Sequence, residues 1–238
     1  MPPHRLGRRA FVLGVAGSVA AACAAGRAAP VVTPGAADTD WTRLPPGPIP
    51  ATDAQGRRYL QTRVPAATRP PVVGAPGPGL NAGLPDGRSA TYVVQDLAAP
   101  VSELGAVFAF GPGNELGSLC LARFDRWDEQ HGSRGDVRST CHLGITPTRW
   151  TYGVLRTPRL EVVRTQEFRT PIAQDGSPHT MRVAVAGSTA TIVEPDGTEI
   201  RIEDPRVAVA GPETFACWEF FKLGPGAGDV TFLRTWAS

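Results

Sequence analysis

Short apolar runs separated by turn-forming residues dominate the chain from residue 89 to its end. The segments 90–95 and 106–110 are rich in Val, Tyr and Phe, and Gly, Pro or Asp bounds each of them. In 181–185 apolar positions alternate with polar or small ones, which is typical of a strand with one covered face. Further runs of this kind are 119–124, 159–164, 190–193, 199–202, 215–221 and 230–233. Short strands with frequent turns and no helical periodicity predict an all-β fold, an antiparallel two-sheet β-sandwich or a barrel.

One turn can be placed from the residues alone. Ala190–Val193 and Glu199–Ile202 flank Glu194-Pro195-Asp196-Gly197. Asp-Gly between two β-branched runs is a strong hairpin signal, because glycine adopts the positive φ that tight turns need. We therefore expect a reverse turn here.

The composition agrees with a turn-rich chain. The 238 residues include 27 glycines and 24 prolines, well above ordinary usage. Prolines cluster at 44–50 and 69–78, where their density excludes helix and central strand and predicts extended loops or sheet edges. The length suits one domain, which we place at 38–238.

The N-terminus is expected to direct export. Residues 1–22 carry arginines but no acid, and Arg8-Arg9 precedes an apolar stretch too short and too rich in small residues for a membrane span. This resembles a twin-arginine export signal. Small residues before Cys23 also resemble a lipobox, which predicts lipidation of Cys23, with cleavage at an Ala-x-Ala site as the alternative. Residues 23–37 would then be a tether holding the domain at the outer side of the cell membrane.

The charge and the cysteines limit the kinds of partner and cross-link that are expected. Without the arginines of residues 1–22 the chain is nearly neutral, so no footprint for nucleic acid remains, and contact with a membrane is expected through the lipid alone. The cysteines Cys120, Cys141 and Cys217 form no CxxC motif, which argues against a local zinc motif. In an exported protein one disulfide is expected, preferentially Cys120–Cys141, with the two pairings of Cys217 left open.

The order of these features resembles a known superfamily. A Trp- and Pro-Gly-rich opening leads to Gly77-Pro78-Gly79-Leu80, then to the strand-turn segment 179–197, and the chain ends in 228–234. This resembles the concanavalin A-like lectin/glucanase jelly roll, shared with laminin G-like modules. The resemblance implies a curved sheet whose concave face binds glycan.

Glucanases of this family carry catalytic acids as Glu-x-Asp-x-x-Glu on one strand, and Glu194 to Glu199 matches that string. The match is rejected because the acids must project from one face of a continuous strand to flank the glycosidic bond. The turn at Asp196-Gly197 instead puts Glu194 and Glu199 on the two sides of a hairpin.

Two groups of side chains are candidate binding residues. In the polar loop 124–131, Trp127 could stack on a sugar while Asp125 accepts hydrogen bonds from hydroxyls, although the loop could equally be a solvated connection. A calcium site using Asp125, Asp128 and Asp136 is an alternative, since calcium prefers oxygen ligands.

The second group is a possible aromatic platform of Trp150, Tyr152 and Trp218, although aromatic residues in strands more often belong to the core. Alternation puts Glu219 on the face opposite Trp218. A carboxylate in such an apolar strand needs a partner, and we expect Arg123 or Arg182.

The sequence contains no Gly-x-Ser-x-Gly elbow, His-x-x-x-His pair or phosphate-binding loop, and no cofactor is expected. The first hypothesis is a non-catalytic, exported envelope protein that binds carbohydrate. The alternatives are a glycan-processing hydrolase or lyase of the same fold, and a protein-interaction or structural envelope module.

Overall fold

The computed structural model describes residues 37–64, 70–74, 77–83, 89–113, 117–127, 137–156, 159–208, 211–222 and 230–238. The expected leader with Arg8 and Arg9, the lipidation site Cys23, and the loop acids Asp128 and Asp136 lie outside these residues. Within the described part of the chain, no helix is long and apolar enough to cross a membrane.

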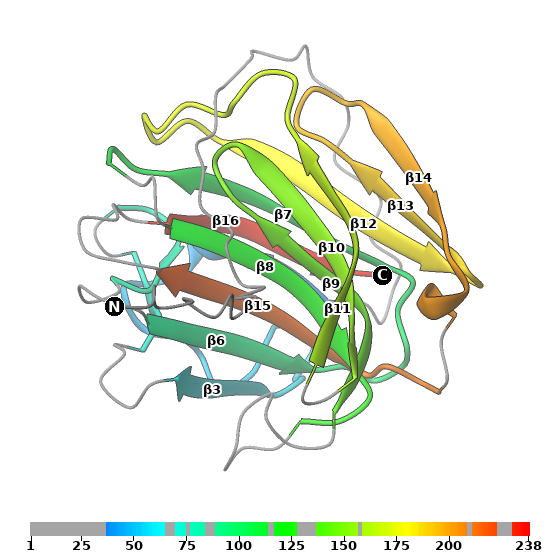
Figure 1. Cartoon of the computed structure of the whole chain (residues 1–238). Coiled ribbons are helices and arrows are strands. Elements are labelled where there is room, and N and C mark those ends of the chain that lie inside the picture. The colour runs from blue at the N-terminus through cyan, green and yellow to red at the C-terminus, as the bar shows by residue number, and fades with distance from the viewer. Residues whose placement is uncertain are drawn as a thin grey trace, which may run out of the picture.

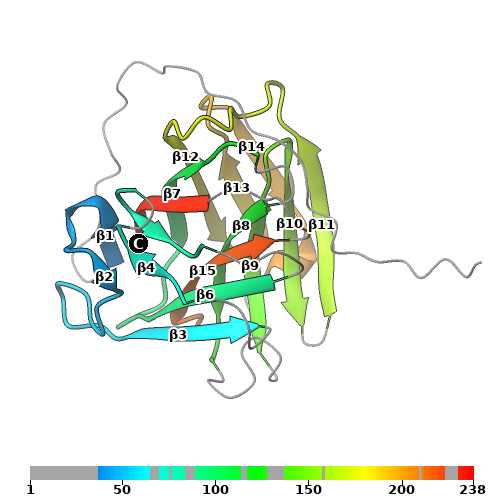
Figure 2. The same cartoon turned by 90° about the vertical axis from the view of Figure 1, so that its left-hand side faces the viewer.

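Two antiparallel sheets stack face to face (Figure 1). The first has seven strands in the order β11 (Arg159–Glu167), β10 (Arg149–Arg156), β9 (Arg138–Ile145), β8 (Gly117–Phe124), β15 (Phe215–Lys222), β6 (Ser89–Asp96) and β3 (Tyr59–Val64). In Figure 2, β3 and β6 lie almost flat while β10 and β11 stand steeply at one side, so this sheet is curved.

The second sheet has nine strands. Eight follow the order β14 (Glu199–Glu203), β13 (Thr189–Val193), β12 (His179–Ala186), β7 (Glu103–Phe110), β16 (Val230–Ala237), β5 (Leu80–Asn81), β4 (Val72–Val73) and β2 (Gly47–Pro48). The ninth, β1 (Ala37–Asp40), also pairs with β16. The short turns of 3-10 helix are η1 (Trp41–Arg43) and η2 (Pro205–Val207). The expected all-β two-sheet sandwich is confirmed.

The main core lies between the two sheets. Trp41, Trp150 and Trp218 are fully buried there, together with Phe108 and Phe232. Burying one large apolar side chain stabilises a fold by roughly 1.5–3 kcal/mol, so these aromatic rings contribute strongly to holding the sheets together.

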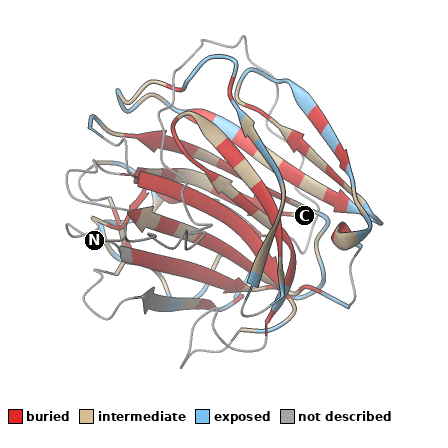
Figure 3. Cartoon of the chain, in the orientation of Figure 1, coloured by how far each residue is buried: buried red, intermediate tan, exposed pale blue. Residues whose placement is uncertain are grey.

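Both outward faces of the sandwich also carry buried side chains. On the nine-stranded sheet, Trp236 stands opposite Gly105, and its ring occupies the space that a side chain at Gly105 would need. Its Nε1 donates a 3.0 Å hydrogen bond to Glu103. On the seven-stranded sheet, β8 is buried along its whole length (Figure 3), so both of its faces are covered.

The hairpin expected around Asp196-Gly197 is present. The Glu194 N–H donates to Thr198 O at 2.9 Å, and Gly197 has a φ of 86°. The segment that matched the glucanase string is therefore a turn between β13 and β14, as the turn chemistry predicts.

Candidate functional site

The face of the seven-stranded sheet that points away from the nine-stranded sheet, called here the outer face, carries a second apolar cluster. Its buried members are Ala90, Tyr92 and Val94 of β6, Cys120, Ala122 and Phe124 of β8, Cys217 of β15, and Val137. Alternation explains this second cluster, because neighbouring residues of each strand point to opposite faces. The outer face is therefore apolar at its centre.

A hollow of about 60 Å³, called here the outer-face hollow, opens on this surface beside the cluster. It is lined by Ser118, Leu119, Cys120, His142, Gly144, Thr151, Leu160, Glu219 and Phe221, which come from β15, β8, β9, β10 and β11. The ladder registers place its polar groups. Glu219 stands directly opposite Cys120, and Gly144 stands opposite Cys120 on the other side. Because Gly144 has no side chain, His142 two residues earlier can approach Cys120 diagonally.

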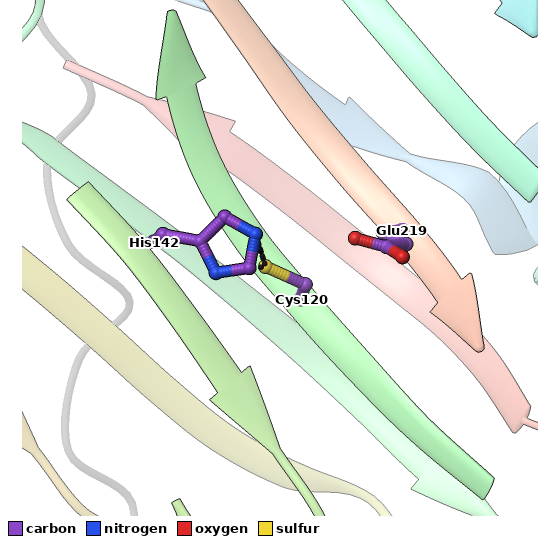
Figure 4. Close-up of side chains that lie close together, drawn as sticks. All are labelled: Cys120, His142 and Glu219. Atoms are coloured by element: carbon purple, nitrogen blue, oxygen red, sulfur yellow. Dashed lines mark hydrogen bonds between the residues drawn. The ribbon is translucent and has the colours of Figure 1, made fainter. Parts of the chain in front are cut away.

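Cys120, His142 and Glu219 form a compact group in the outer-face hollow (Figure 4). The Cys120 Sγ lies 3.5 Å from both ring nitrogens of His142. One sulfur, one ring nitrogen and one carboxylate oxygen all lie within 4.8 Å of one another. Figure 4 shows the Cys120 side chain between the other two.

The apolar surroundings favour the neutral form of all three groups. Burial raises the pKa of the Glu219 carboxyl to about 8, although a hydrogen bond with Tyr92 acts in the opposite direction. Burial also raises the pKa of the Cys120 thiol well above its usual value, and Glu219 adds to this effect. The pKa of His142 falls to about 4, again through burial. Desolvation, which disfavours the charged form, is thus the leading cause in each case.

The expectation that Glu219 pairs with Arg123 or Arg182 is wrong. The expectation that Glu219 lies on the face opposite Trp218 is confirmed. Arg123 stands opposite Ala216, whose side chain belongs to the inter-sheet core, so its own side chain points away from the outer face. There it pairs with Glu213 at 3.1 Å. Arg182 lies on β12 of the other sheet, where it pairs with Glu103.

The expected aromatic platform is also contradicted. Trp150, Tyr152 and Trp218 are fully buried in the inter-sheet core. Trp150 and Tyr152 stand opposite Ile145 and Leu143, which share that core. Their alternation in β10 therefore turns both rings inward, and it is Thr151 between them that lines the outer-face hollow.

Trp127 and Asp125 lie at the end of β8, as expected for a rim of the sheet. Trp127 is half-buried, and its ring lies against Tyr92 and Phe124 with centroid separations of 5.8 Å and 5.4 Å. Asp125 Oδ1 accepts a 2.8 Å hydrogen bond from the Arg138 N–H. Since Tyr92 stands opposite Glu219, Trp127 is connected to the outer-face hollow through one intervening ring.

The expectation of a Cys120–Cys141 disulfide is wrong. Cys141 stands opposite Arg123 and packs in the inter-sheet core, whereas Cys120 belongs to the outer-face cluster. The two thiols thus lie on opposite faces and three register positions apart, which excludes the short Cβ separation of a disulfide. Cys120, Cys141 and Cys217 are all free and buried.

Sequence reasoning singled out Glu219 but missed Cys120 and His142 as its neighbours. The segment 138–145 mixes polar and apolar residues and was not predicted as a strand, so no face could be assigned to His142. The group has a signal in the sequence. In each of the three strands, one polar side chain (Cys120, His142 or Glu219) stands between two residues of the inter-sheet core.

No protein-family model matches the chain, and no curated protein sequence matches it. Similarity appears among solved structures. LamA from Zobellia galactanivorans, in complex with laminaritriose and laminaritetraose, has a TM-score of 0.53 at 8% identity, covering 86% of this chain and 98% of that one. The β-glucanase of Bacillus licheniformis has a TM-score of 0.51 at 6% identity, and the match covers 87% of this chain and 99% of that one. A glycosyl hydrolase family protein from Mycobacterium fortuitum has a TM-score of 0.50 at 8% identity, and the match covers 84% of this chain and 98% of that one.

The chain has the concanavalin A-like fold. At these identities the likeness extends to the arrangement of the strands and no further, so the chemistry of the outer-face hollow has to be argued from this chain's own residues.

Proposed function

We propose that this chain is an exported, membrane-anchored envelope protein whose sandwich binds carbohydrate on the outer face of the seven-stranded sheet without cleaving it. The observation that carries this proposal is the outer-face hollow. Phe221 and Leu160 offer apolar surface there, and Thr151 and Ser118 offer hydroxyl groups. Sugars need this combination, because their rings have apolar C–H faces and hydrogen-bonding edges.

Trp127 extends the proposed site. Its half-buried ring rests on Tyr92, which in turn neighbours Glu219, so a sugar bound at the outer-face hollow could continue over the indole. Indole and phenol rings combine an apolar face with a polar edge, which suits contact with a sugar. The structural relatives support the choice of ligand class, since LamA was solved with two laminari-oligosaccharides.

The binding test is a screen of the full chain against laminari-oligosaccharides, other β-glucans and bacterial envelope polysaccharides. We expect at least one glycan to bind, and Trp127→Ala to weaken that binding by about 10-fold, which corresponds to about 1.4 kcal/mol. Arg201→Ala is a suitable control, because Arg201 is exposed on β14 of the other sheet. A well-folded chain that binds none of these glycans would favour a protein-interaction role instead.

A second candidate, glycan processing, is supported by the burial of Glu219 in the outer-face hollow. Burial raises the pKa of Glu219 to about 8 and so favours the protonated carboxyl that a general acid requires. The usual glycosidase mechanism needs a second carboxylate about 5–10 Å away. Among the described residues that line the outer-face hollow, Glu219 is the one carboxylate, and this supports binding over hydrolysis. Release of shorter saccharides by the wild type but not by Glu219→Gln would reverse the preference.

Export and anchoring form a separate part of the proposal, supported by the residues around Arg8, Arg9 and Cys23. Replacing both arginines with lysine is expected to retain the protein in the cytoplasm. Cys23→Ala is expected to abolish labelling by a radioactive fatty acid and to release the protein from the membrane fraction. Unchanged localisation of both variants would contradict this part and leave the glycan-binding part standing.

A further inference from the structure

Cys120, His142 and Glu219 combine three donor types on three neighbouring strands. The central strand, β8, supplies the sulfur, while β9 and β15 supply the nitrogen and the oxygen from its two sides. Hydrogen-bonded ladders fix the strands, so the backbone already holds the three donors in one small region (Figure 4). This region is at the centre of the sheet and needs no loop to form it.

We propose that Cys120 Sγ, one ring nitrogen of His142 and one carboxylate oxygen of Glu219 bind a Zn²⁺ ion, with the fourth coordination position facing the outer-face hollow. Thiolate, imidazole and carboxylate are the ligands that zinc uses in proteins. The inference does not depend on carbohydrate binding.

The distances fit such a site. With zinc–ligand bonds of about 2.0–2.3 Å, two donors of a tetrahedral site lie about 3.3–3.8 Å apart. The 3.5 Å between Cys120 Sγ and each ring nitrogen of His142 falls in this range, and a turn of the ring about χ2 aims one of the two nitrogens at the ion. The widest separation in the group is at most 4.8 Å, and rotation of the flexible Glu219 side chain can shorten it.

The charges around the site also favour a cation. Two other glutamates with little exposure have arginine partners, since Glu213 pairs with Arg123 and Glu103 with Arg182. The buried Glu194 instead accepts hydrogen bonds from Trp150 and Gln166. The described residues lining the outer-face hollow include no arginine or lysine, and a divalent ion bound there would supply the positive charge that Glu213 and Glu103 obtain from arginine.

The arrangement fits metal binding better than a nucleophilic triad. In a Cys–His–acid triad the histidine stands between the nucleophile and the carboxylate, because it takes the proton from one and is oriented by the other. Here Cys120 stands between His142 and Glu219 (Figure 4). Three donor atoms within 4.8 Å of one another, with the acid beside the cysteine rather than the histidine, suit a bound ion better than a nucleophile.

Binding of zinc must release protons. Zinc binds cysteine as the thiolate, so the ion displaces the thiol proton of Cys120. At least one proton per Zn²⁺ should therefore appear in the solvent.

The test uses the full chain, stripped of metal with a chelator and titrated with Zn²⁺ and with Co²⁺. We expect one ion per chain, release of at least one proton in calorimetry across buffers, and a thiolate-to-cobalt charge-transfer band in the near ultraviolet. Cys120→Ala is expected to remove the band and to weaken zinc binding by about 100-fold or more, and His142→Ala and Glu219→Ala to weaken it by at least about 10-fold.

Cys217→Ala is the matched control, because Cys217 is also a buried thiol on the outer face but lies outside the trio. It should retain the cobalt band and the affinity. If Cys120→Ala does not fold, Cys120→Ser tests the same ligand with a side chain of similar size. Absence of stoichiometric zinc binding, or binding that survives both Cys120→Ser and His142→Ala, would overturn the proposal.

Discussion

The indole Nε1 of Trp150 donates a 2.6 Å hydrogen bond to Oε1 of Glu194, and both side chains are buried. Trp150 belongs to β10 of the seven-stranded sheet, while Glu194 directly follows β13 of the nine-stranded sheet. Gln166 Nε2 is a second donor to the same oxygen at 3.3 Å. This acceptor therefore links the two sheets beside the β13–β14 turn.

Removing that acceptor should be costly. Glu194→Leu leaves the buried Trp150 N–H without its partner, and we expect it to lower the free energy of unfolding by about 1–3 kcal/mol relative to Glu194→Gln, which keeps an oxygen. Urea unfolding followed by tryptophan fluorescence measures the difference. Equal stability of the two variants would show that the hydrogen bond contributes nothing.

The same glutamate should give a pH dependence. Burial raises the pKa of Glu194, with the hydrogen bond from Trp150 acting in the opposite direction. The unfolded chain then loses this proton at a lower pH than the folded protein does. The contribution of Glu194 to stability is complete below its ordinary pKa of 4.5 and is lost as the pH rises through the raised value. Glutamine does not titrate, so the stability of Glu194→Gln relative to wild type should increase from pH 4 to pH 7. A constant difference would contradict the shift.

Gly105 should not tolerate even a methyl group. A Cβ at this position would lie 2.0 Å from Cζ2 of Trp236, so the indole would have to move and lose its hydrogen bond to Glu103. We expect Gly105→Ala to destabilise the fold by about 2–4 kcal/mol in thermal or urea unfolding. Gly211→Ala is the control, because a Cβ at that position would meet nothing within 4 Å and only a small change is expected. A mild effect at Gly105 would mean that Trp236 can repack.

The buried Arg123–Glu213 pair should show strong coupling. Glu213 also accepts hydrogen bonds from the Thr140 N–H at 2.5 Å and from its hydroxyl at 3.0 Å. Arg123→Met leaves the carboxylate without its cation, and we expect a cost of about 3–5 kcal/mol. Adding Glu213→Gln, which keeps an acceptor for Thr140, should restore part of the loss. A double-mutant cycle measures the coupling, and additive effects would indicate that the pair is not electrostatically linked.

The free cysteines provide a direct chemical check. Peptide mapping of the folded protein without reductant is expected to recover the peptides of Cys120 and Cys141 unlinked, because the two thiols lie on opposite faces of the sheet. Alkylation in denaturant should modify both. A peptide containing the cross-linked pair would require a different register of β8 and β9.

The strands with clear alternation or β-branched runs could be predicted from the sequence. The run 215–221 corresponds to β15, and the turn at Asp196-Gly197 lies between β13 and β14 as expected. β9 and β10 escaped prediction because polar residues interrupt them and both pairings of β10 contain register irregularities. Local pattern carries little information about such strands, since their pairing stabilises them only in the assembled sheet.

The candidate site was less predictable for the same reason. Alternation correctly placed Glu219 on the face opposite Trp218, but which strand lies beside β15 depends on long-range pairing. Without the strand order, Cys120 could not be recognised as the direct neighbour of Glu219. Arg123 and Arg182 are expected as partners only because a carboxylate in an apolar strand needs one. For Trp150 and Tyr152 the prediction left a binding platform and core packing as alternatives, because β10 itself was missing from it.

The position of β15 and β16 has a consequence for how the chain acquires its structure during synthesis. β15 lies between β8 and β6, and β16 lies between β7 and β5. Each sheet therefore lacks an interior strand until the ribosome has made residues 215–237, and the earlier strands would present open edges until then. Folding of both sheets must wait for these two strands, and a product that ends before residue 215 should aggregate rather than form a smaller stable domain.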